Sequence, residues 1–462
     1  MRDAKQHAAE MVSTLRKQGH QAYLAGGCVR DLLLSREPAD YDVATDATPQ
    51  QVMQIFPQTY AVGEQFGVVL VPQSQFDGAT GAPARQGTTV EVATFRSDVG
   101  YSDGRHPDEV RFTKDPREDV QRRDFTINGM MLDPATNEVL DFVGGRDDLK
   151  AGIIRAIGDP ERRFTEDKLR MLRAVRFAAR FNYKIDPATM SAIQKLAPKI
   201  HQVSCERVRE ELTKMLTEGQ ARKAFELLDT TKLLPEVLPE IAAMKGVQQP
   251  PQYHPEGDVL VHTLLLLEKL QPSASGRVSG SVSGSVSKTL AWGALLHDVG
   301  KPATFRIAPD RIRFDGHVEV GVKMAAEILR RLRFSNHETD QILALVDNHM
   351  RFGAVQRMKQ STLKKFLRLP SFEEHLELHR IDCLSSHGQL DAYEYTQEQL
   401  RSMPPEAIRP TPLITGRDLI EAGYEPGPRF KEVLTAVEDA QLEGRLASRE
   451  AAMEYVRREF PA

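Results

Sequence analysis

Hydrophobic and polar positions alternate in two different ways along this chain. Up to about residue 145, short β-type runs such as AYLAGG (22–27) and TTVEVATF (88–95) are separated by helical stretches. From about residue 150 onward, apolar residues recur at the spacing of amphipathic helices, and few strand candidates remain. The pattern therefore predicts an α+β fold, with a small mixed-sheet head followed by all-α regions.

Segments rich in Pro, Gly and Ser interrupt this pattern and suggest domain boundaries. They are a long loop between two strands (74–87), a Pro-rich linker (246–258), a low-complexity surface loop (273–289) and a second Pro-rich break (401–418). We expect a head at 1–145, a helical neck at 146–245, a third domain at 250–395 and a helical tail at 405–462.

Composition narrows the class of protein. At 462 residues the chain is long enough for several domains, and 40% hydrophobic with 27% charged residues is ordinary for a globular protein. The three cysteines form no CxxC pair, which argues against a disulfide framework or a thiolate zinc site and favours a cytoplasmic location. An amphipathic start and the lack of a long apolar run predict neither export nor a membrane span. The sequence leaves the oligomeric state open.

Candidate chemistry appears first in LAGGCVRDLLLSREPADYDVATDA (24–47). Gly26 and Gly27 stand at a predicted strand-to-helix turn, where backbone N–H groups can approach a polyphosphate. Asp40 and Asp42 alternate on a second predicted strand and should point to one face, where paired carboxylates hold Mg²⁺. Either feature alone is usually a plain turn or a solvated strand, but their order and spacing together favour catalysis. Glu91 could join them, or be an ordinary exposed strand residue.

A predicted helix over EDKLRMLRAVRFAAR (166–180) carries a second constellation. Asp167, Arg170 and Arg173 follow an i, i+3 spacing and should share one face. An acceptor beside a guanidinium could present an edge that pairs with a base. Exposed helical ion pairs are the plain alternative. Basic residues outnumber acidic ones between about 150 and 230, which suggests a surface for RNA phosphates despite the net charge of −4.

Imidazoles and carboxylates converge in the region from 254 to 387. The pair His297-Asp298 ends an apolar helix, and further candidates come from other predicted helices. Such a set suits one or two divalent ions, with Mn²⁺, Mg²⁺, Ni²⁺ and Fe²⁺ all compatible. Each His taken singly is more often a surface or core residue.

Five blocks in order resemble the class II tRNA nucleotidyltransferases and bacterial poly(A) polymerases of the polymerase-β superfamily. The blocks are GGCVRD (26–31), DYDVATDA (40–47), RRDFTINGM (122–130), EDKLRMLRAVRFAAR (166–180) and ERVREEL (206–212). They cover roughly the first half of the chain. The resemblance implies a nucleotidyltransferase head that uses Mg²⁺, with the tRNA 3′ end, CTP and ATP as partners.

The resemblance also assigns roles to individual residues. Asp40 and Asp42 would be the catalytic metal ligands. Asp167 and Arg170 would select the base. The remaining nucleotide contacts would come from Gly26, Gly27, Arg30, Arg123, Asp124, Arg173 and Arg176.

The histidine-rich region looks like an HD-superfamily phosphohydrolase domain. That pattern makes His262, His297, Asp298 and Asp382 the primary metal set, while His317 and His349 could hold a second ion. Similar domains on tRNA nucleotidyltransferases remove 2′,3′-cyclic phosphates or phosphates from RNA ends, so a repair activity could accompany nucleotide addition.

Three activities share such a head: CCA addition, A-only addition and poly(A) synthesis. The segment 97–112 resembles a flexible loop that CC-only enzymes lack, and the tail 413–446 resembles tails of CCA-adding enzymes. Leu34-Ser35 and His106 depart from the usual pattern, where Gly and a second Arg are common, which leaves the specificity open. We expect CCA addition without a nucleic-acid template. A phosphohydrolase with an RNA-binding head is the alternative from another class.

Overall fold

The computed structural model describes residues 4–60, 67–72, 89–101, 104, 107–270 and 286–461. The chain divides into two compact units. Unit 1 comprises Met1–Met215 with Lys223–Pro239, and unit 2 comprises Leu216–Arg222 with Glu240–Ala462. Among the described residues, no helix is both long enough and apolar enough to cross a membrane.

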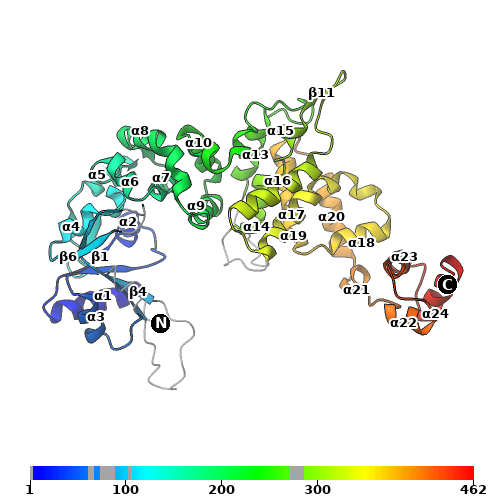
Figure 1. Ribbon diagram of the computed structural model, residues 1–462, viewed down its shortest axis with the longest axis horizontal. Coiled ribbons are helices and arrows are strands. Elements are labelled where there is room, and N and C mark those ends of the chain that lie inside the picture. Colours follow the sequence, from blue (N-terminus) through cyan, green and yellow to red (C-terminus); the bar gives the residue numbers. More distant parts are fainter. Residues whose placement is uncertain are drawn as a thin grey trace. The chain divides into compact units, whose positions relative to one another are not determined.

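A six-stranded mixed sheet forms the head of unit 1, in the order β3-β4-β2-β1-β7-β8 (Figure 1). Only the β2–β4 pair is parallel. Its strands are β1 (Ala22–Ala25), β2 (Asp42–Thr45), β3 (Val68–Pro72), β4 (Thr89–Thr94), β7 (Met130–Leu132) and β8 (Val139–Asp141). The head helices are α1 (Ala4–Lys17), α2 (Gly27–Leu33), α3 (Pro49–Ile55), α4 (Pro116–Gln121) and α5 (Gly145–Ala151).

Local sequence explains these elements. Val90 and Val92 of β4 are buried while Glu91 between them is exposed, which is the two-residue period of a strand. Thr48 caps α3 through a capping box, and Pro49 starts that helix. At the end of α2, Ser35 takes a positive φ of 54°, so it adopts the left-handed conformation that Gly adopts more easily.

Asp side chains cap two of the helices that follow the head, Asp159 for α6 and Asp186 for α8. The helices that lie wholly or mostly in unit 1 are α6 (Pro160–Glu166), α7 (Leu169–Phe181), α8 (Pro187–Leu196), α9 (Cys205–Thr217), α10 (Ala221–Thr230) and α11 (Leu234–Val237). The next helix, α12 (Pro239–Ala242), lies in unit 2 except for its first residue. Strands β9 (Ile153–Ile154) and β10 (Lys184–Ile185) form a small parallel pair. The predicted continuous helix over 166–180 is wrong at its start, because Asp167 is extended, with φ −143° and ψ 108°.

Unit 2 is helical. Its helices up to the second Pro-rich break are α13 (Val259–Glu268), α14 (Lys288–Leu296), α15 (Lys301–Thr304), α16 (His317–Arg331), α17 (Asn336–Asn348), η4 (His349–Arg357), α18 (Gln360–Leu367), α19 (Phe372–Ser385) and α20 (Asp391–Ser402). After it come α21 (Pro405–Ile408), α22 (Gly416–Glu421), α23 (Arg429–Leu442) and α24 (Arg449–Glu459). The last three helices share an apolar core that includes Leu419, Val433 and Val456.

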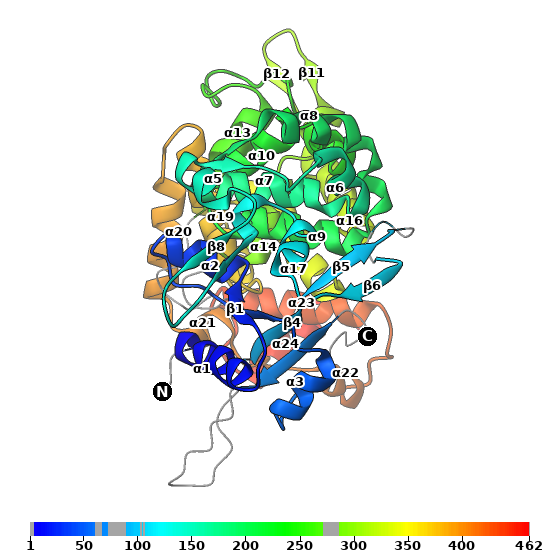
Figure 2. The ribbon, with the colours of Figure 1, turned by 90° about the vertical axis from the view of Figure 1, so that its left-hand side faces the viewer.

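One small hairpin interrupts these helices. Strands β11 (Arg306–Ile307) and β12 (Ile312–Arg313) pair antiparallel and extend away from α16 (Figure 2). The predicted loop at 74–87, most of the low-complexity segment 273–289 and His106 lie outside the described residues. The described ends of the segment 97–112 form an antiparallel pair, β5 (Arg96–Val99) with β6 (Glu109–Phe112), rather than an irregular loop.

Candidate active site and metal centre

The glycine turn lies directly beside a catalytic candidate. Gly26 joins β1 to α2 with φ 77° and ψ −133°, a conformation that L side chains rarely adopt. A Cβ added to Gly26 would lie 3.1 Å from Nη1 of Arg123 and 3.8 Å from Oδ2 of Asp42. The turn therefore has to be glycine for two reasons, backbone conformation and close approach. The sequence resemblance assigns Gly26, Arg123 and Asp42 to one site, and in the structure these three residues lie close to one another.

Three carboxylates share this site. Asp42 is the first residue of β2 and pairs in register with Glu91 of β4. Asp40 lies two residues before β2, so the prediction that it alternates with Asp42 on one strand is wrong. Burial raises the pKa of Asp42 to about 6; the negative charges of Glu91 and Asp40 add to the rise, and the Arg123 guanidinium opposes it. Mutually repelling acids of this kind fit a bound divalent cation.

Asp119 orients the arginines of this site, a role that the sequence reasoning missed. Its Oδ2 accepts hydrogen bonds from Nε and Nη2 of Arg123, at 3.2 and 2.9 Å, and its Oδ1 accepts from Arg122. Burial would raise the pKa of Asp119, but the two guanidinium groups hold it below its ordinary value. The i, i+4 spacing of Asp119 and Arg123 across the end of α4 was a usable signal.

Asp167 and Arg170, which are expected to select the base, each form hydrogen bonds with other residues of the chain. The Asp167 carboxylate accepts two hydrogen bonds from Arg207, at 3.2 and 2.7 Å. Arg170 donates to Glu166 and to the carbonyl of Arg122. The expected common helical face is therefore wrong for Asp167, which lies outside α7.

Further along α7, the candidates form internal ion pairs. Arg173 donates to Oδ2 of Asp124 through Nε and Nη2, at 2.9 and 2.8 Å, and Arg176 donates to buried Glu211 at 2.7 Å. In α2, Arg30 is 4% exposed and pairs with Asp31. In this structure Asp124, Arg30 and Arg176 are thus engaged in ion pairs, and their nucleotide contacts stay predictions.

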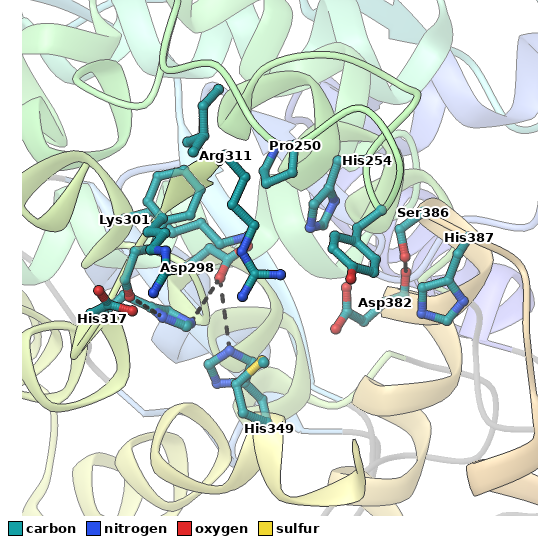
Figure 3. A pocket seen from close by; sticks show the side chains of 16 residues that line it. Pro250, His254, Asp298, Lys301, Arg311, His317, His349, Asp382, Ser386 and His387 are labelled. Atoms are coloured by element: carbon teal, nitrogen blue, oxygen red, sulfur yellow. Dashed lines mark hydrogen bonds and ion pairs between the residues drawn. The ribbon is translucent and has the colours of Figure 1, made fainter. Parts of the chain in front are cut away.

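A second site lies entirely within unit 2. Four imidazoles lie around Asp298: His262 of α13, His297 directly after α14, His317 at the start of α16 and His349 directly after α17. Figure 3 shows Asp298 with His317 and His349. Nε2 of His297 lies 3.1 Å from Oδ2 of Asp298, and Nε2 of His317 and of His349 each lie 3.8 Å from Oδ1.

Each imidazole in this site is oriented by a bond from its far nitrogen. The Nδ1 atoms of three of them donate to the carbonyls of Ala294, Phe314 and Val346, and Nδ1 of His262 donates to Glu256 at 2.7 Å. The Nε2 atoms point inward, and among the described residues none of the four has a hydrogen-bond partner of good geometry. In a neutral ring with this tautomer, Nε2 is unprotonated. His262 differs in charge: burial would lower its pKa, but Asp382, whose Oδ1 lies 3.1 Å from its Nε2, and Glu256 raise that pKa to about 9. Buried imidazole lone pairs with fixed tautomers are what a metal site presents.

The six predicted ligands fall into two separate groups of three. One is His262, His297 and Asp382, and the other is Asp298, His317 and His349; within each, the ligand atoms lie within 4.8 Å of one another. All six predicted ligands are thus brought together, although Asp298 groups with His317 and His349 rather than with the primary set. A third group, His254, Glu256 and His262, includes two residues that the sequence reasoning did not assign.

Electrostatics agree with this arrangement. Burial would raise the pKa of Asp298, but the nearby His297 and Lys301 hold it well below its usual range. Burial and the neighbouring His297 lower the pKa of His349 to about 4, so this ring is neutral near pH 7. The site therefore combines ionised carboxylates with a neutral imidazole, and its donor set fits a divalent ion.

Three family models match the chain. They are the Poly A polymerase head domain over residues 22–155, the "Probable RNA and SrmB-binding site of polymerase A" over 182–245, and the tRNA nucleotidyltransferase domain 2 over 317–456. Residues 22–155 match a poly A polymerase head domain. The resemblance inferred from the five sequence blocks is confirmed, and the resemblance of the histidine-rich region to an HD domain stays a prediction. The matched segments leave out 246–316, which holds His262, His297 and Asp298.

Relatives and solved structures agree with this assignment. The chain is 40% identical over 233 residues to a CCA-adding enzyme of Geobacillus sp. (strain WCH70), and 42% identical over 209 residues to one of Enterococcus faecalis. These matches cover 50% and 45% of the chain, and 54% and 48% of the relatives. The chain thus spans about half the length of the curated relatives it matches.

A full-length structural likeness extends beyond these segments. The Bacillus stearothermophilus CCA-adding enzyme in complex with CTP matches with a TM-score of 0.70 and 27% identity, covering 99% of each chain. The glycine turn, the carboxylates and Arg123 all lie within the matched poly A polymerase head.

Proposed function

We propose that this protein adds CCA to the 3′ end of tRNA from CTP and ATP, without a nucleic-acid template. The observation that carries the proposal is the cluster of Asp42, Asp40 and Glu91 beside the strained Gly26 turn, in a poly A polymerase head. Support comes from relatives named CCA-adding enzymes and from a full-length structural likeness to one in complex with CTP.

The head residues have separable parts in this reaction. Mg²⁺, bound by Asp40 and Asp42, would activate the attacking 3′-hydroxyl and neutralise charge on the triphosphate. Arg123, fixed by Asp119, would bind the nucleotide phosphates. The glycine turn allows the nucleotide to approach the backbone closely. Asp167 and Arg170 would select the base, with Arg207 positioning Asp167.

The test is extension of a tRNA that ends before CCA, with CTP, ATP or both. We expect two added residues with CTP alone and three with both nucleotides. A second tRNA, ending in CC, completes the test: addition of A to it without extension of the first tRNA would instead identify an A-adding enzyme. A long tail with ATP would identify a poly(A) polymerase. No extension under any condition would overturn the proposal.

We further propose that unit 2 holds a divalent-metal phosphohydrolase centre with an RNA end as substrate. The four buried, unbonded Nε2 atoms around Asp298 support it. The bound metal would supply a nucleophilic hydroxide and neutralise phosphoryl charge. The imidazole and carboxylate donors fit Ni²⁺, Mn²⁺, Mg²⁺ and Fe²⁺.

Metal analysis of the purified protein tests the phosphohydrolase proposal. We expect bound divalent metal in the wild type and its loss in His297→Ala, with tRNA extension retained. If His297→Ala lost all function while Asp42→Ala kept it, the head would be only an RNA-binding module. Equal metal content in the wild type and His297→Ala would contradict the metal centre.

The proposal also includes the domain boundaries at 145, 245 and 395. It includes a cytoplasmic location, with which the three free cysteines are consistent.

A further inference from the structure

A cavity of about 430 Å³ opens beside the metal-ligand cluster of unit 2 (Figure 3). Its wall includes Asp298, His317 and Asp382, so a ligand in the cavity would contact the metal centre. The same wall includes Arg311 and Arg313 of the β11–β12 hairpin. The cavity therefore joins a candidate metal site to a cationic surface that the phosphohydrolase proposal does not use.

The hairpin holds these arginines close to a metal ligand. Arg311 and Arg313 are two residues apart, which directs their side chains to the same side of the extended segment. The chain then passes through Phe314 and Gly316 to His317, the first residue of α16. Nδ1 of His317 donates to the Phe314 carbonyl at 2.9 Å, so the segment is anchored where the imidazole is oriented.

The ion pairs around the cavity leave the arginines of the hairpin available to bind an anion. Lys301 is already engaged, because its Nζ lies 2.7 Å from both Asp298 and Gln249. Arg313 pairs with exposed Asp310 at 2.9 Å, and Arg311 lies 3.9 Å from the same carboxylate. Exposed pairs of this kind contribute little and are easily exchanged for a ligand.

Arg313 also has an unused donor. Its Nε is buried and has no hydrogen-bond partner among the described residues. The side chain as a whole is partly exposed, so a ligand oxygen in the cavity could accept a hydrogen bond from this N–H. A guanidinium fork matches the oxygens of a phosphate group. The exposed ring of Tyr253, also in the wall, could stack on a base.

We propose that Arg311 and Arg313 bind a second phosphate group of the substrate, next to the one that faces the metal centre. This inference rests on the proposed phosphohydrolase function and narrows its substrate class. The preferred substrate is an oligonucleotide end, in which a terminal phosphate is followed by a phosphodiester. A nucleoside monophosphate, with one phosphate, lacks the group that the hairpin recognises.

The test compares two probes on the full-length, Mn²⁺-loaded protein. Adenosine 3′-monophosphate carries one phosphate, and the dinucleotide ApAp adds a phosphodiester to the same terminal group. The variant is Arg311→Gln/Arg313→Gln. Arg330→Gln is the control, because it removes a charge from an exposed position on α16 outside the cavity wall.

The double variant should raise KM for ApAp at least about tenfold, because removing both guanidinium groups removes at least one charge-assisted hydrogen bond. Its KM for the monophosphate, its metal content and its tRNA extension should match those of Arg330→Gln. An equal effect on both probes, or no effect on ApAp, would overturn the inference.

Failure of the phosphohydrolase function is recognised separately. If the wild type hydrolyses neither probe, that function is wrong, and calorimetric binding of ApAp decides the inference instead. All variants keep the same head, so any binding of ApAp to the head is equal in all of them. The comparison therefore uses the difference in ApAp affinity between variants. Weaker ApAp binding in the double variant than in Arg330→Gln would sustain phosphate recognition by the hairpin, and equal binding would contradict it.

Discussion

Gly26→Ala separates backbone strain from the geometry of the head site. At φ 77° and ψ −133°, an alanine costs about 1–3 kcal/mol of folding stability. The added Cβ would also lie 3.1 Å from Nη1 of Arg123, closer than ordinary contact, so the guanidinium must move away from the turn. Because misplacement of a binding group by about 1 Å can cost 100-fold in rate, a shift of a few tenths of an ångström is expected to lower kcat by roughly 3- to 10-fold.

Gly19→Ala provides the matched control. Gly19 also has a positive φ, of 86°, but a Cβ there would meet no atom within 4 Å. Urea denaturation should show destabilisation of both variants, whereas CTP incorporation into tRNA, measured well below the unfolding transition, should fall only in Gly26→Ala. Equal kcat in the two alanine variants would refute the view that the glycine is required for the site.

Three further predictions concern other parts of the chain. Glu256→Gln should weaken divalent-metal binding about 10- to 100-fold, because the hydrogen bond that fixes the tautomer of His262 weakens; calorimetry with Mn²⁺ checks this, and unchanged affinity would contradict it. Glu211→Gln leaves buried Arg176 without its countercharge and should cost about 3–5 kcal/mol in urea denaturation, whereas a loss below 1 kcal/mol would show that the pair is dispensable. Burial lowers the pKa of His375 to about 4, below its ordinary value, so the unfolded chain binds the extra proton and stability falls as pH drops from about 6.5 toward 4. This amounts to about 2 kcal/mol at pH 5, and His375→Gln should flatten the pH dependence of Tm measured in a chelator.

The sequence predicted the parts of the head that depend on local rules. The strand-turn-helix around Gly26 and the α+β architecture follow from residue periods and glycine chemistry. The start of α7 was missed because the i, i+3 spacing of Asp167 and Arg170 fits a continuous helix. The chain breaks there, where Oδ1 of Asp167 accepts a hydrogen bond from the N–H of Leu169.

Long-range pairing could not be deduced from spacing. Arg173 meets Asp124 across 49 residues, and Arg207 meets Asp167 across 40, so only the folded chain shows that these charges are paired. The sequence predicted which residues form the histidine cluster. It did not predict which of them lie close enough to share one ion. The carbonyl and carboxylate acceptors that orient each ring leave no sequence pattern, and Glu256 was therefore missed.

Asp42→Asn tests the central claim most directly, because it keeps the shape of the side chain and removes its charge. The measurement is addition of CCA to a tRNA lacking it, with CTP, ATP and Mg²⁺, alongside tRNA binding. We predict three-residue extension by the wild type, no extension by Asp42→Asn, and equal tRNA binding by both. Extension by Asp42→Asn at the wild-type rate would contradict a metal-binding carboxylate at this position and, with it, the proposed catalytic site.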